Sequence, residues 1–214
     1  MNARSFDASA DYNWLGDVKV NVDGYFDVAH SGRDLSWGTI GYDFMWQEIK
    51  GDFTITAKLE SLASDDAWNG RKAGLMVRSS LDATSMMRAY GVKRTGGKFY
   101  LVGVQKTTDT EPYVRDQDKA AGASLSDYPA SPTWVRLRRK GNVFTCDYKT
   151  ADTDQRWVTH YEYEDVNGEY GETAYVGLAA WGEGDGGYTA VPYYLWRFSD
   201  VRLHMPKGIA IVIR

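Results

Sequence analysis

Residues 71–105 read RKAGLMVRSSLDATSMMRAYGVKRTGGKFYLVGVQ, and this stretch decides the fold. It contains three apolar runs, at residues 73–80, 86–93 and 98–105, with short polar segments between them. Residues 95–97, Thr-Gly-Gly, supply the turn chemistry that joins the last two runs. The stretch therefore predicts three consecutive antiparallel strands.

Side chains along each of these strands point alternately to the two faces of a sheet. In the first run, Leu75 and Val77 share one face, whereas the opposite face carries Gly74, Met76 and Arg78. Because an apolar face must be covered, the alternation predicts a second sheet packed against the first.

Short strands and turns continue along the rest of the chain. Residues 52–60 alternate between polar and apolar, which is typical of a strand with one face in water. Gly141 and Asn142 form a two-residue hairpin turn, and a bulge is expected near Ser199 and Asp200. Further strands are predicted at residues 18–22, 134–140, 143–149, 158–162, 174–182 and 193–204.

The sequence shows no clear helix and no internal repeat of useful period. Residues 106–132 have neither a strand period nor a capped helix, so we expect a long irregular segment there. Regular short strands with turn signals predict an all-β sandwich of two antiparallel sheets. A sandwich of this class routinely reaches 214 residues as one unit, and we expect residues 1–214 to form a single domain.

The composition narrows the classes of partner. Eight Trp and fifteen Tyr supply more aromatic surface than a core of this size needs, so some aromatic side chains are expected outside. The net charge of -4, with both signs interspersed, disfavours nucleic acid and anionic membranes as partners. The single Cys146 excludes an internal disulfide.

No apolar span reaches the length of a membrane helix, and the first residues lack the apolar core of a signal peptide. We therefore expect a soluble, monomeric protein. Two compartments stay open: the cytoplasm, or the exterior if the chain is the mature part of an exported protein.

Five segments occur in an order that is similar to a known family: GDFTITAKLES (51–61), AGLMVRSSLD (73–82), WVRLRRKGN (134–142), AYVGLAA (174–180) and RFSDVRL (197–203). The chain resembles, over about residues 14–203, a bacterial family of concanavalin A-like jelly-roll domains of unknown function, some labelled "regulation of enolase protein 1". Members often have Glu directly after the Arg of the second segment, whereas here Arg78 precedes Ser79 and Ser80.

The resemblance implies a two-sheet, antiparallel jelly-roll β-sandwich of the lectin and glucanase type, with a concave face. Members of the family frequently accompany carbohydrate-active enzymes, which favours a glycan ligand. Folds of this kind also host glycosidases, lyases and interaction modules, so the site must decide between them.

The strand at residues 174–182 offers the first candidate contacts for a sugar. If Val176 and Leu178 are buried, the opposite face carries Tyr175 and Trp181 with small residues between them. Small residues flanked by aromatics form a shallow groove, and Arg78 belongs to the matching face of its own strand. The alternative for Trp181 is a plug at the edge of the sandwich.

Arg88 and Tyr90 share one face of the next strand, but the sequence does not show which face that is. If they join the groove, the site combines aromatic rings, which stack on sugar C–H faces, with forked donors for hydroxyls or uronate carboxylates. The alternative is that Arg78 and Arg88 form ion pairs across the sheet and that Tyr90 packs against a neighbouring strand.

Two acidic pairs raise the question of a metal. Glu183 and Asp185 lie in a glycine-rich loop and are predicted to bind the ligand or a structural calcium ion. Calcium needs six to eight oxygens, so the metal stays open, and no other cofactor is expected. Asp152 and Asp154 are expected to accept hydrogen bonds within a turn instead.

The sequence predicts no catalytic residues. Retaining sugar hydrolysis needs two carboxylates about 5 Å apart, and no Glu-x-Asp-x-x-Glu run is present. His160 and Tyr161 form the one adjacent pair that suits the base of a polysaccharide lyase, and Cys146 is expected to be an inert core thiol.

The sequence therefore predicts a non-catalytic, lectin-like module that binds an oligosaccharide or polysaccharide on its concave face. One alternative is a polysaccharide lyase or glycoside hydrolase on the same fold. The other is a protein-interaction or structural module.

Overall fold

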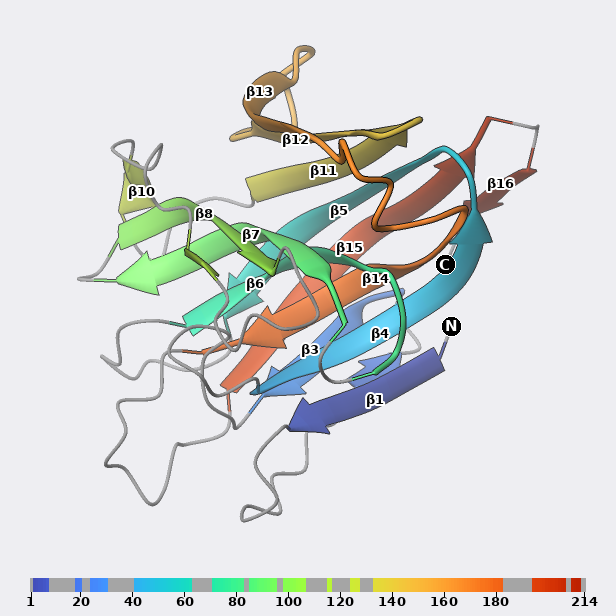
Figure 1. Ribbon diagram of the computed structural model, residues 1–214. Helices are drawn as coiled ribbons and strands as arrows, with labels where there is room; N and C mark the ends of the chain where they lie inside the picture. Colours follow the sequence, from blue (N-terminus) through green and yellow to red (C-terminus); the bar gives the residue numbers. More distant parts are fainter. Residues whose placement is uncertain are drawn as a thin grey trace.

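The computed structural model describes residues 2–7, 18–20, 24–30, 41–62, 71–82, 85–95, 98–106, 115–116, 124–127, 133–182, 194–206 and 209–212. Within these ranges there is no helix, and hence none long and apolar enough to cross a bilayer. The strands form two antiparallel sheets that lie one over the other (Figure 1).

The first sheet contains the three strands predicted from the opening stretch, which are adjacent and antiparallel. Its spatial order is β1 (Asn2–Asp7), β4 (Gly41–Lys50), β14 (Thr173–Trp181), β6 (Arg71–Arg78), β7 (Met87–Thr95), β8 (Lys98–Lys106) and β10 (Ser124–Asp127), and β9 (Arg115–Asp116) also pairs with β8. Strands β9 and β10 were not predicted because they are short. Both strands form by pairing with β8, and their own residues show no alternation that would predict a strand.

The second sheet has the spatial order β13 (Val158–Glu164), β12 (Val143–Lys149), β11 (Thr133–Lys140), β5 (Phe53–Leu62), β15 (Tyr194–Met205), β3 (Phe26–His30) and β2 (Val18–Val20), and β16 (Ile209–Val212) pairs with β15. The predicted hairpin is confirmed, because Gly141 turns between β11 and β12 with a φ of 58°. The predicted bulge is also confirmed: the register shifts after Ser199, and Asp200 has a φ of 47°.

The main core lies between the two sheets. Leu75 and Val77 of β6 and Val176 and Leu178 of β14 are fully buried in it, as the alternation predicted. Opposite them, Ile55 on β5 is also fully buried. Each such side chain stabilises the fold by about 1.5–3 kcal/mol when it leaves water.

The first sheet is apolar on its outer face as well. A second group of side chains, none more than 7% exposed, lies there; we call it the outer-face cluster, and it consists of Tyr42, Phe44, Trp46, Met76, Met87, Ala89, Val102, Val104, Ala179 and Trp181. The central strands of this sheet are therefore buried on both faces.

Candidate functional site

A strip of residues with little or no side chain crosses the middle of the outer face of the first sheet. Ala179, Gly74 and Gly91 are register partners on β14, β6 and β7, and Gly177 shares their face. A Cβ atom at any of these three glycines would lie within 2.1 Å of a carbonyl oxygen on the neighbouring strand. Only glycine permits such an approach, so this strip is a flat floor.

Large side chains border the floor on both sides. On β4, the rings of Phe44 and Trp46 stack with their centroids 5.6 Å apart. On the other side, on β8, lie Val102 and Val104, while Met76 on β6 is the register partner of Gly177. The small residues that the sequence predicted therefore share one face, with aromatic rings on the β4 side and aliphatic side chains on the β8 side.

Trp181 lies on this face but is not an exposed platform. Its side chain is fully buried in the outer-face cluster, beside its register partner Tyr42. Its indole N–H has no hydrogen-bond partner within the described ranges. Replacing Trp181 by Ala should therefore cost stability, since a buried Trp carries a large packing energy.

Arg78 also lies on the predicted face, and it too is fully buried. Its Nε and Nη2 atoms donate to the Ser85 hydroxyl at 3.2 and 2.6 Å, and Nη2 also donates to the carbonyl of Asp82. The Ser85 hydroxyl in turn donates to the carbonyl of Ser80. Arg78 therefore holds the turn between β6 and β7 in place.

Tyr175 is the predicted aromatic residue of this face that solvent reaches. It is half-buried against the outer-face cluster, and its register partners are Arg78 on β6 and the exposed Glu48 on β4. The turn that begins after Arg78 carries half-buried Ser80 and exposed Asp82, and the Ser80 hydroxyl donates to the Asp82 carboxylate. We call Tyr175, Glu48, Ser80 and Asp82 the Tyr175 end.

Arg88 and Tyr90 do not join this face. The structure places them on the face of β7 that looks toward the second sheet, where they are 5% and 2% exposed. Met87 and Ala89 occupy the outer face instead. The sequence could not choose between the faces because both faces of this strand are covered.

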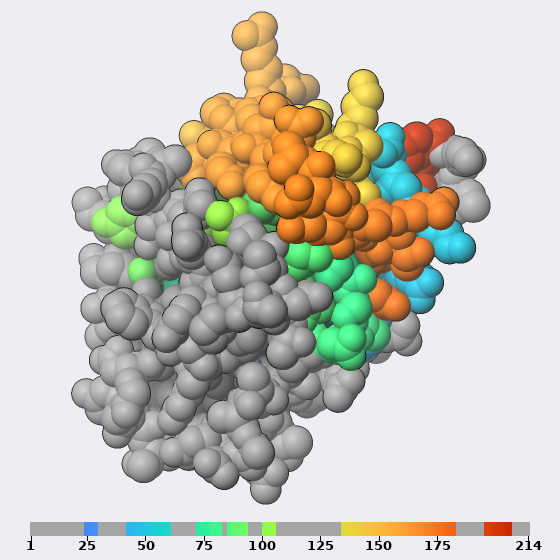
Figure 2. Space-filling model, in the orientation of Figure 1, coloured from blue at the N-terminus to red at the C-terminus, as the bar shows by residue number. Residues whose placement is uncertain are grey.

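Arg88 and Tyr90 belong to a group of polar and aromatic side chains at one edge of the sandwich. We call it the edge cluster, and it consists of Arg88, Tyr90, Gln105, Cys146, Tyr148, His160, Tyr161, Tyr163 and Tyr170. Figure 2 shows the orange residues around β13 beside the green residues of β7 and β8 at this edge. The sequence placed His160 and Tyr161 next to each other but gave no sign of their contact with β7.

The contacts inside the edge cluster cross from one sheet to the other. Arg88 Nη1 donates to Gln105 Oε1 at 2.7 Å, and the guanidinium carbon lies 3.1 Å from the centroid of the Tyr163 ring. The Tyr90 ring lies 5.7 Å from the ring of His160.

Burial suppresses ionisation in this cluster. It raises the pKa of the Tyr90 hydroxyl far above its ordinary value. It also raises the pKa of the Cys146 thiol from 9.0 to about 12, although the charge of Arg88 opposes the shift. Cys146 is thus the buried core thiol that the sequence predicted, and neither group supplies a base at neutral pH.

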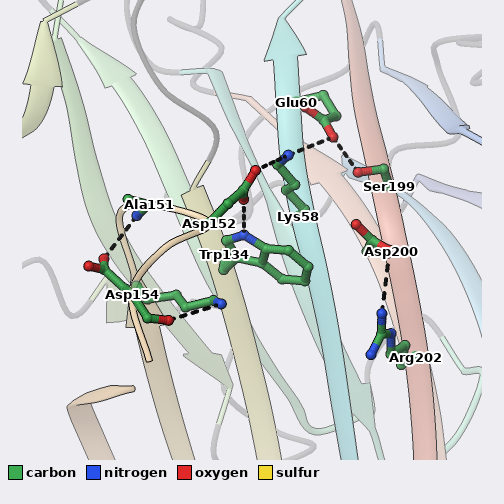
Figure 3. A network of polar contacts seen from close by, with 10 residues as sticks. Lys58, Glu60, Trp134, Ala151, Asp152, Asp154, Ser199, Asp200 and Arg202 are labelled. Atoms are coloured by element: carbon green, nitrogen blue, oxygen red, sulfur yellow. Dashed lines mark hydrogen bonds and ion pairs between the residues drawn. The ribbon is translucent and has the colours of Figure 1, made fainter. Parts of the chain in front are cut away.

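The outer face of the second sheet has a different character, with charged side chains paired to one another (Figure 3). The Asp152 carboxylate accepts from Trp134 Nε1 at 2.6 Å and from Lys58 at 2.8 Å. Asp154 accepts from the backbone N–H groups of Thr150 and Ala151. The turn bonds predicted for both aspartates are therefore confirmed for Asp154 but not for Asp152.

Glu183 and Asp185 lie outside the described residues, so their predicted roles as ligand or calcium contacts stay predictions. In the part of the chain that the structure does describe, no group of three or more His, Cys, Asp or Glu side chains is placed to hold a metal ion.

The sequence matches no protein-family model and no curated protein. Many solved structures share its architecture, including the three that follow. A functionally unknown protein from Saccharomyces cerevisiae has a TM-score of 0.60 at 16% identity, over 92% of this chain and 97% of its own. The alginate lyase from Klebsiella pneumoniae has a TM-score of 0.56 at 9% identity, over 90% of this chain and 85% of its own. An alginate lyase from Pseudomonas aeruginosa has a TM-score of 0.51 at 9% identity, over 92% of this chain and 86% of its own.

Identities this low establish a shared fold and nothing finer. The resemblance to the "regulation of enolase" family stays a prediction. The two antiparallel sheets and the structural likeness together identify the chain as a concanavalin A-like jelly-roll β-sandwich.

Proposed function

We propose that the protein is a non-catalytic carbohydrate-binding module that holds a glycan at the Tyr175 end. The observation that carries this proposal is the half-buried ring of Tyr175, which emerges at one end of an otherwise closed aromatic face. An aromatic ring stacks on the C–H face of a sugar. Glu48, Ser80 and Asp82 supply oxygen atoms for its hydroxyl groups.

Arg78 contributes by positioning the site. Because its guanidinium is bound to Ser85 and Asp82, it fixes the turn that carries the polar groups beside Tyr175. A fixed turn loses less entropy when a ligand binds, which raises affinity.

A glycan array with the whole protein tests the proposal, followed by the substitution Tyr175→Ala. We expect this variant to bind any hit at least about tenfold more weakly, because stacking of this kind contributes roughly 1.4 kcal/mol or more. Its melting temperature should change little because Tyr175 is only half-buried. The matched control is Trp157→Ala, which removes a half-buried aromatic residue near the second sheet. Equal binding by the Tyr175→Ala variant and the wild type would refute the proposal.

A polysaccharide lyase is the second candidate, and one observation favours it. The structure brings His160 against Tyr90, near Arg88, and jelly-roll lyases use sets of these residue types. Two of the structurally similar proteins are alginate lyases. Against it, the Tyr90 hydroxyl is buried and its pKa is raised, so it does not act as a base.

Incubation with uronate polymers separates the two candidates. A lyase forms an unsaturated product that absorbs in the ultraviolet, whereas a binding module leaves the polymer intact by mass spectrometry. No observation favours an interaction module. Among the described residues, the large exposed hydrophobic side chains are Val158 and Val166, which are too few to form an apolar patch.

A further inference from the structure

We propose that the edge cluster is a second binding site, in which Arg88 holds the carboxylate of a small organic anion. This site lies on the opposite face of the first sheet from the Tyr175 end. The inference therefore does not depend on the proposed carbohydrate function.

The first argument is charge. Arg88 is 5% exposed, and its contacts are with the Gln105 side chain, the Tyr161 hydroxyl and the Tyr163 ring. None of these groups is negative, and within the described part of the chain no carboxylate pairs with Arg88. A buried cation without a counter-charge is costly, so the site attracts an anion.

The other buried arginines among the described residues differ from Arg88 in the groups that surround the guanidinium. Arg139 is 7% exposed, but it donates to the carbonyl oxygens of Gly141 and Gly171, and the charges of Asp165 and Asp52 act on it favourably. Arg78 is bound by the turn that follows β6. Arg139 therefore has carboxylate charges acting on it, whereas the groups that bind Arg88 are an amide oxygen, a hydroxyl and an aromatic ring.

The second argument is the geometry of the guanidinium. Gln105 Oε1 accepts from Nη1, and the Tyr163 ring covers one flat side of the group. The Nε–H has no hydrogen-bond partner within the described ranges, although the atom is buried. Arg can bind a carboxylate with two parallel hydrogen bonds, and the side of the guanidinium that carries Nε–H is one of the sides that form such a pair.

Two buried hydroxyls of the edge cluster are further hydrogen-bond donors. The Tyr90 and Tyr170 hydroxyls have no hydrogen-bond partner among the described residues, and the charge of Arg88 acts on Tyr170. Burial raises the pKa of both hydroxyls, so both stay protonated and can donate a hydrogen bond. Gln105, Tyr161 and Tyr163, which contact Arg88, are half-buried, and so solvent reaches part of the edge cluster.

The burial of Arg88 limits the ligand class. Because Arg88 is only 5% exposed, a polymer cannot lie flat against its guanidinium. We therefore assign the site to a small monocarboxylate, and acetate is the simplest probe of that chemistry.

Thermal unfolding of the whole protein in sodium acetate, with sodium chloride balancing the ionic strength, tests the inference. We expect a saturable rise in melting temperature for the wild type, because a ligand that binds the native state stabilises it. Arg88→Met should lose this rise or need at least tenfold more acetate. The matched control Arg139→Met should keep it relative to its own baseline, and Tyr175→Ala should keep it as well.

Three results would overturn the inference: no saturable effect on the wild type, the same effect on Arg88→Met, or an equal effect of chloride. If Arg88→Met does not fold, Arg88→Lys decides the matter. That variant keeps the charge but loses the fork, so it should bind acetate at least tenfold more weakly, and unchanged affinity would refute the assignment.

Discussion

Gly177→Ala should strongly destabilise the protein, because β14 lies against β4 at this position. An ideal Cβ on Gly177 would meet the carbonyl oxygen of Met45 at 1.7 Å and the Cα atom of Trp46 at 2.8 Å. These are backbone atoms, so no rotation of a side chain relieves the clash. The two strands themselves must separate.

The size of the effect follows from that separation. Ordinary contact begins at 3.4 Å, so the added methyl group must move by about 1.7 Å relative to the Met45 carbonyl. Hydrogen bonds between strands do not survive such a shift, and losing two of them costs about 2 kcal/mol. Overpacking adds about 1–3 kcal/mol, so we expect a total loss of roughly 3–5 kcal/mol and a fall in melting temperature of roughly 10 °C.

Urea denaturation followed by tryptophan fluorescence measures the loss, with the slope of the transition checking that unfolding stays two-state. The matched control is Gly103→Ala on β8, where an added Cβ meets nothing within 4 Å. That change should leave the free energy of unfolding within about 1 kcal/mol of the wild type. If Gly177→Ala also stays within about 1 kcal/mol, the close approach of β4 and β14 is wrong.

Two further predictions concern buried titratable groups. Asp147 is fully buried, and although burial alone would raise its pKa, hydrogen bonds from Arg138, Thr159 and Arg136 lower it overall. Its carboxylate therefore stabilises the fold above the unfolded pKa of about 4 and loses that effect as the pH falls below it. Asp147→Asn should lower the free energy of unfolding by about 2 kcal/mol at pH 7, less than for a fully buried ion pair because Arg136 and Arg138 are 20% and 40% exposed. The stability of this variant, measured as the pH is lowered, should fall less steeply than that of the wild type. An unchanged dependence on pH would count against this ion pair. The Cys146 thiol, with its pKa raised to about 12, should react with a thiol reagent at least about tenfold faster in urea than in the folded protein, and equal rates would contradict its burial.

Much of the fold could be predicted because alternation is a local property of a strand. The separation of Val176 and Leu178 from Tyr175 and Trp181 needed only the period of two, and the structure confirms it. The short strands β9 and β10 could not be predicted, because they depend on pairing with the edge of β8.

The candidate site was less accessible to the same reasoning. Alternation shows that Arg88 and Tyr90 share a face, but both faces of β7 are buried, so no difference in polarity marks which face looks inward. Burial of Trp181 is equally invisible, since it depends on what covers the sheet and not on the strand itself. The contact of Arg88 with Tyr163 joins residues far apart in the sequence, and so no local sequence pattern predicts it.

The contrast between the two outer faces bears on where a ligand can bind. On the second sheet, Arg136 and Arg138 both donate to Asp147, so these three charged groups bind one another within the fold. The outer face of the first sheet is closed along most of its length and opens at Tyr175. A polar ligand can then bind only where the buried strands end in turns or where the edge of the sandwich is open to solvent. The Tyr175 end and the edge cluster are such places, and they lie on opposite faces of the same sheet. Because β6 separates β14 from β7, substitutions at Tyr175 and Arg88 act on different contacts, and so binding of a glycan and binding of a carboxylate can be tested independently.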